Sequence, residues 1–141
     1  SVVITPEGVE GLTVGAALAD QDVGGSSLNL EETTVFVTYA VGSFTLGYQM
    51  SDYEHATSGS DQESTAAGVS YAVNDDMSIS YNMHDLETES TSDQDQESTG
   101  ISASFTSGGL TLAGSMNDVE NIAGTTTRDS EGYEVTLTFA F

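Results

Sequence analysis

The last nine residues of the chain alternate strictly between large apolar side chains and small or polar ones. The apolar positions are Tyr133, Val135, Leu137, Phe139 and Phe141. A period of two predicts a β-strand whose two faces meet different surroundings. Chain termini usually fray, so an aromatic last residue in register with such a face constrains the fold strongly. Two kinds of fold accommodate it: the edge of a soluble β-sandwich, or a strand that crosses a membrane.

The same alternation recurs upstream, in segments that we expect to be strands of about 9–10 residues. Their apolar positions lie within 12–18, 35–41, 44–50, 67–73, 77–83, 101–105 and 110–116, and residues 1–5 read as the tail of another strand. Short turns at 42–43, 74–76 and 107–109 alternate with polar stretches at 20–32, 54–63, 87–97 and 119–131, which we expect to be loops. Strands of this length suit a tilted crossing of a bilayer, whereas globular strands are usually about 5–6 residues long.

A repeat links these hairpins. Met50, Met83 and Met116 are spaced by 33 residues, and Asp52, Asp85 and Asp118 follow at the same interval. Each unit is one hairpin of two long strands, so the repeat predicts a meander that closes into a barrel, with short turns on one rim and long loops on the other.

The charge is strongly acidic and unevenly placed. Asp and Glu total 23 against one basic residue, Arg128, for a net charge of −22. Of the 23 acids, 18 lie in the four long polar stretches or, as Asp52, Asp85 and Asp118, one or two residues before them. This balance argues against nucleic acid as a partner. Charge is costly on a lipid-facing strand, so a membrane barrel requires such segregation. Eighteen carboxylates at one mouth would also concentrate cations there, which predicts a cation-selective pore.

These features together resemble the general diffusion porins of Gram-negative outer membranes, in particular the acidic alphaproteobacterial or marine type. The resemblance rests on the closing strand, on Gly11-Leu-Thr-Val-Gly15 after a Thr-Pro turn, and on the alternation of turns and loops. It implies a single all-β domain over residues 1–141: an antiparallel up-and-down transmembrane β-barrel with about eight strands plus the tail of another, as the C-terminal portion of a barrel of about 16 strands. It also implies a homotrimer surrounded by outer-membrane lipid, with small hydrophilic solutes passing through it. The closing strand, from Tyr133 to Phe141, would be the signal read by the barrel assembly machinery.

Residues of the opposite phase are the expected pore lining. They are Gln49, Ser78, Ser80, Asn82, His84, Ser102, Ser104, Ser115, Asn117 and Glu134. The side chains of this phase are mostly Gly, Ala, Ser and Thr, as at Thr13, Gly15, Ala17, Gly68 and Ser70. They are too small to fill the interior of a closed eight-stranded barrel, which side chains normally pack, so a larger water-filled barrel is favoured. Porins of this family usually carry a basic cluster at the constriction, and this sequence has none.

Other chemistry is weakly indicated. Asp93, Asp95 and Glu97 have a spacing that suits loosely bound calcium, although the glycine and terminal glutamate of an EF-hand are missing. No nucleophile motif indicates an enzyme, and we expect no other cofactor. Two alternatives stay open: a small eight-stranded membrane barrel that acts as an anchor or adhesin through its acidic loops, and a secreted, calcium-stabilised soluble β-protein.

Overall fold

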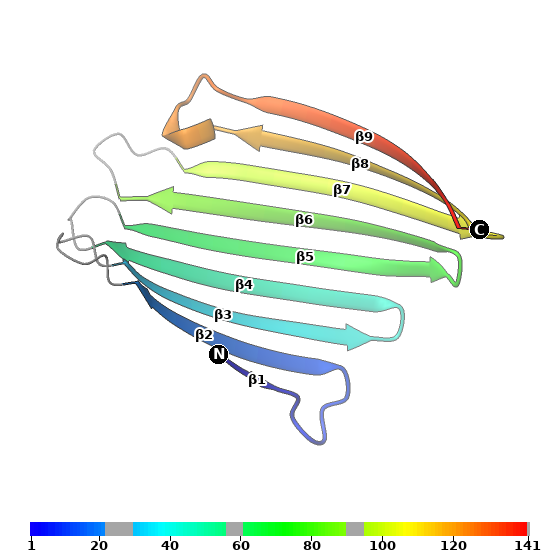
Figure 1. Cartoon of the computed structure of the whole chain (residues 1–141), viewed down its shortest axis with the longest axis horizontal. Helices are drawn as coiled ribbons and strands as arrows, with labels where there is room; N and C mark the ends of the chain where they lie inside the picture. Colours follow the sequence, from blue (N-terminus) through cyan, green and yellow to red (C-terminus); the bar gives the residue numbers. More distant parts are fainter. Residues whose placement is uncertain (22–29, 56–60, 90–94, 141) are drawn as a thin grey trace.

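Nine strands form one antiparallel sheet in the order of the sequence (Figure 1). This computed structural model describes residues 1–21, 30–55, 61–89 and 95–140. The strands are β1 (Val2–Ile4), β2 (Leu12–Gln21), β3 (Leu30–Val41), β4 (Phe44–His55), β5 (Gln62–Asn74), β6 (Met77–Thr88), β7 (Gln96–Ser107), β8 (Leu110–Glu120) and β9 (Ser130–Phe139), with a 3₁₀ turn, η1 (Ile122–Gly124), between the last two. The predicted all-β meander, with about eight long strands plus a short one, is confirmed. No helix in these ranges is long and apolar enough to span a membrane.

Tight turns join the strands at one end of the sheet, on the right in Figure 1. β3 and β4 pair along their whole length up to Val41↔Phe44, so Gly42 and Ser43 alone connect them. Two-residue hairpins need positive φ angles, which glycine adopts without strain, and Gly42 has φ 58°. The β5–β6 turn is closed differently, by a hydrogen bond of 2.9 Å from the Asp76 amide to Asn74 Oδ1.

The strands extend further than the alternation of apolar residues suggested. They run to 10–13 residues, so β3, β5, β7 and β9 begin inside stretches that we expected to be loops, and β2, β4, β6 and β8 end inside such stretches. The loop boundaries were therefore wrong by two or three residues at each end. The reason is that backbone groups pair regardless of side-chain polarity, and the acidic residues at these ends continue the strand. The remainders at 22–29, 56–60 and 90–94 lie outside the described residues.

The sheet has no hydrophobic core in its described part. No apolar side chain there is buried, and many large ones are exposed, with Tyr133 at 87% and Val135 at 73%. A β-sandwich would cover such residues with a second sheet, but the described strands all belong to one sheet. The soluble alternative required Val135, Leu137 and Phe139 to pack against another sheet, and here they are exposed.

The two edge strands do not pair with each other within the described residues. β1 pairs with β2, and β9 pairs with β8. They lie at opposite sides of the curved sheet (Figure 1). The described strands consequently do not form a closed ring of eight.

Two glycines in the β1–β2 connection allow a matched test of the backbone. Both have positive φ, 93° at Gly8 and 82° at Gly11, but only at Gly11 would an added Cβ collide with the carbonyl oxygen of Ala40. The Ala40 amide also donates a hydrogen bond of 2.9 Å to the Gly11 carbonyl. We expect Gly8→Ala to cost about 1–2 kcal/mol of unfolding free energy through left-handed strain, and Gly11→Ala to cost about 3 kcal/mol because that hydrogen bond is lost as well.

Urea unfolding of the two variants, compared at equal slope, measures this difference. Equal losses for Gly8→Ala and Gly11→Ala would show that contact with β3 does not matter.

Candidate functional site

The strand register divides the side chains of the sheet between two faces. The ten residues predicted to line a pore all belong to one of them, which we call the polar face: Gln49, Ser78, Ser80, Asn82, His84, Ser102, Ser104, Ser115, Asn117 and Glu134. The opposite side, the apolar face, carries Tyr133, Val135, Leu137 and Phe139 of the closing strand. The register thus places the whole predicted set on one face. That this face lines a pore stays a prediction. Phe141 lies outside the described residues.

Hydroxyl groups pair across neighbouring strands on the polar face. Ser80 and Ser102 lie 2.7 Å apart between their Oγ atoms. Ser78 and Ser104 are 2.9 Å apart. Each such group can donate or accept, so these pairs keep further capacity for water. On β9, the Thr136 hydroxyl donates to Glu134 Oε1 at 2.8 Å. Together these residues form a row of polar groups that extends from β6 to β9.

Gly100 makes room for two side-chain amides on the polar face, at the residue pair that follows Ser80 and Ser102 along the strands. Gly100 lies opposite Asn82 on one side and Asn117 on the other. A Cβ built on Gly100 would be 2.7 Å from Asn82 Oδ1 and 2.9 Å from Asn117 Oδ1. Both amides therefore lean over the glycine, and any side chain at position 100 would displace them.

His84 is held on the polar face by a neighbour on β5. Its Nε2 lies 2.8 Å from Ser64 Oγ, so the imidazole orientation is fixed by a hydrogen bond whose direction depends on the tautomer. Ser51, with only 5% of its surface exposed, is linked to Thr34 by a 2.9 Å hydrogen bond. His84, predicted to line a pore, thus belongs to a set of hydrogen-bonded polar side chains on this face.

The sequence reasoning missed an aromatic residue of the polar face, Phe36. Phe36 lies between Val35 and Val37, but the register places it opposite Gly15 and Gln49, on the polar side. A Cβ on Gly15 would collide with the Phe36 ring, so the ring lies across the bare backbone of β2. The only signal in the sequence was that Phe36 lies two residues from Thr34 and from Thr38, because residues two apart on a strand share one face.

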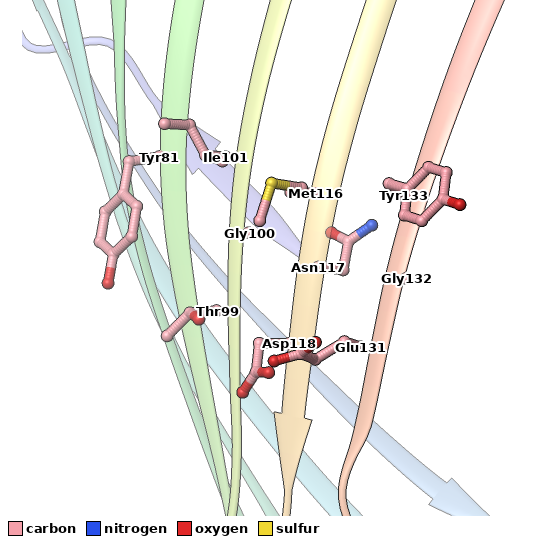
Figure 2. A pocket seen from close by; sticks show the side chains of 10 residues that line it. All are labelled: Tyr81, Thr99, Gly100, Ile101, Met116, Asn117, Asp118, Glu131, Gly132 and Tyr133. Atoms are coloured by element: carbon pink, nitrogen blue, oxygen red, sulfur yellow. The ribbon is translucent and has the colours of Figure 1, made fainter.

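The apolar face carries a shallow groove over β7 to β9. Figure 2 shows Tyr81 and Tyr133 on either side of it, with Ile101 and Met116 between them and two carboxylates at one end. The groove has a volume of about 230 Å³, and Met116 is 64% exposed. Tyrosines that combine an apolar ring with a polar tip are typical of membrane interfaces.

Most acids of the strand ends share the apolar face and form what we call the acidic rim. Several oppose each other directly, including Asp52↔Glu63 and Asp85↔Glu97. The rim consists of Asp20, Glu31, Asp52, Glu54, Glu63, Asp85, Glu87, Glu97, Asp118, Glu120 and Glu131. On the strands of the sheet, only Glu32 and Glu134 are acids of the polar face.

The structure describes two of the three predicted calcium ligands. Asp95 and Glu97 are described, and Asp93 lies outside the described residues. Within the described ranges no group of three or more His, Cys, Asp or Glu side chains is arranged to hold a metal ion. Loosely bound calcium stays a prediction.

Comparison with solved structures gives the fold a clear counterpart. A crystal structure titled "Structure of porin refined at 1.8 Angstroms resolution" superposes with a TM-score of 0.80 at 17% sequence identity. The match covers 97% of this chain and 49% of the porin chain, so this chain spans about half the length of that protein. At this identity the likeness is evidence for the fold alone.

Sequence comparison identifies the family. The curated proteins contain no match. The model of a family described as Gram-negative porin matches residues 3–98, which is more than half of the chain. Proteins of this family and fold are channels rather than enzymes, and they are located in the outer membrane. The chain therefore belongs to the Gram-negative porin family, and it is an outer-membrane protein.

Proposed function

We propose that this chain forms part of the wall of a water-filled channel through which small hydrophilic solutes and ions diffuse passively. The polar face carries the proposal, because it presents hydroxyl, amide and imidazole groups across β4 to β9 with no apolar plug over them in the described residues. Small polar groups suit a hydrated lumen, whereas a closed narrow barrel needs larger side chains to fill its interior.

The apolar face would then lie against lipid. Its exposed residues include Ile101 at 55%, Leu112 at 46% and Phe139 at 59%. Exposed to water, a continuous surface of this kind would cause aggregation. In hydrocarbon the same surface is favourable, and the backbone ladder leaves few polar groups unpaired.

The complete pore needs more than this sheet. Its open edges, and its match to about half of a solved porin chain, support a larger barrel in which these nine strands are one portion. We also propose a homotrimer, and recognition of the closing strand β9 by the barrel assembly machinery, as the family resemblance implies. The acidic alphaproteobacterial or marine subtype stays a prediction.

Planar-bilayer recording of the purified natural protein tests the channel. We expect discrete open-channel steps whose size scales with bulk conductivity, as for diffusion through water. A protein that inserts without ever conducting would reject the channel and favour the alternative of an anchor or adhesin with acidic loops.

A charge placed on either face tests which one meets lipid. Ile101 and Ser102 are neighbours in the middle of β7 on opposite faces. We expect Ile101→Arg to lower the unfolding free energy in lipid vesicles by about 2–4 kcal/mol, the cost of an arginine near the bilayer midplane. Ser102→Arg should cost much less, because a hydrated lumen solvates the guanidinium.

Urea unfolding in lipid vesicles measures both variants. The assignment of the faces is wrong if Ser102→Arg proves the more destabilising of the two.

Cation selectivity is the finer part of the proposal, and the register changes which acids should produce it. The acidic rim lies on the apolar face, so its carboxylates would be separated from the lumen by the barrel wall. Glu32 on β3 and Glu134 on β9 share the polar face with the proposed lining. Charges that line a confined aqueous path concentrate counterions most effectively.

Reversal potentials in a salt gradient measure that selectivity. We expect a cation-selective pore, and we expect Glu32→Gln with Glu134→Gln to move the reversal potential toward zero. The matched control removes the same charge from the acidic rim, as Glu63→Gln with Glu97→Gln, and should have the smaller effect. All shifts should shrink from about 0.1 M to 1 M salt, as the Debye length falls from about 10 Å to about 3 Å. A larger effect from the rim pair would contradict the assignment to lumenal acids.

A further inference from the structure

A hollow of about 320 Å³ lies over β3 to β6. Gly47 and Gly68 are directly opposed at its base, so the base is bare backbone. Phe36 and Gln49 border it from β3 and β4, and Asn82 and His84 border it from β6. These side chains belong to the polar face, so under the proposed function the hollow opens to the solute path.

Phe36 gives the hollow an aromatic wall. Its ring is half-buried and held across Gly15 on β2, which leaves little freedom for the ring to swing away. Aromatic rings bind flat apolar surfaces with little loss of side-chain entropy, because only two torsions have to be fixed. The polar face is made mostly of small polar groups, and the Phe36 ring has no packing partner in a core, since the described residues form none.

The other three side chains supply hydrogen-bonding groups. Gln49 Nε2 donates to Ser51 Oγ at 3.3 Å. His84 is oriented by Ser64 through Nε2, and Asn82 leans over Gly100. A carboxamide has both donors and an acceptor, so each amide retains capacity for a ligand after these contacts.

We propose that this hollow is a weak binding subsite for uncharged, hydroxylated ring solutes of monosaccharide size. The C–H face of such a ring would lie on Phe36, and its hydroxyls would bond Gln49, Asn82 and His84. Pockets that bind small molecules combine apolar walls with a few polar groups that fix orientation, in volumes of about 300–1,000 Å³. The proposal rests on the proposed function, because it requires solutes to reach the polar face.

Current block by glucose in planar bilayers tests the subsite on the intact natural protein. We expect the ion current to fall saturably with glucose concentration, after correction for bulk conductivity. Sorbitol has similar hydroxyls but no ring face, and it should produce only the bulk effect.

Variants at position 36 separate ring contact from general pore blockage. Phe36→Leu keeps apolar volume but loses the planar face, and should raise the half-blocking glucose concentration about tenfold. Phe36→Tyr keeps the ring and should retain the block. Phe105→Leu makes the same change on the apolar face, away from the hollow, and should behave like the natural protein. Open-channel steps from each variant confirm that it folds and inserts, and the block is compared as a fraction of each variant's own open-channel current.

Two failures are distinguishable. If the natural protein never conducts, the proposed channel is rejected and the subsite with it. If it conducts but glucose acts only through bulk conductivity, or if Phe36→Leu is blocked as strongly as the natural protein, the subsite alone is rejected.

Discussion

The backbone hydrogen-bond ladder is the interaction on which this structure depends. With no apolar side chain buried in the described part of the chain, the sheet cannot be held together by a packed core. What remains is continuous pairing of consecutive strands, from β1 to β9. In hydrocarbon each unpaired backbone group costs several kcal/mol, so such a ladder is both permitted and enforced there. The two-faced side-chain pattern fits the proposed function, in which one face has lipid as its solvent and the other has water.

The same requirement applies to the edges. β9 offers its outer side to no strand in the described residues, and neither does β1. Within a bilayer those edges must be paired, so the barrel that includes this sheet needs strands beyond these nine. The solved porin chain that matches is about twice as long as the matched region, which is consistent with that requirement.

Much of the fold was predictable because the period of two survives in the sequence. Met50, Met83 and Met116 recur at one interval, and all three lie on the apolar face. The ends of the strands were not predictable from apolar residues, since carboxylates replace them there. The alternation between the two faces continues there, for example at Asp85 and Glu87. We interpreted the charge of these stretches as the sign of a loop. Phe36 was missed for another reason: its partner Gly15 becomes visible only once the register is known.

Repulsion among the carboxylates of the acidic rim explains where the rim must lie relative to the membrane. Carboxylates directly opposite one another on neighbouring strands repel, so water and counterions must screen them, and the rim has to lie beyond the hydrocarbon. The stretch of β7 from Glu97 to Ser107 spans roughly 33 Å at about 3.3 Å per residue. A strand tilt of about 40° reduces this to about 25 Å, the height of the apolar band in outer-membrane barrels. Under the proposed function, the rim on one side and the tight turns on the other would therefore delimit the hydrocarbon, and the acids that face outward at this boundary would serve hydration and placement in the membrane before they serve the pore.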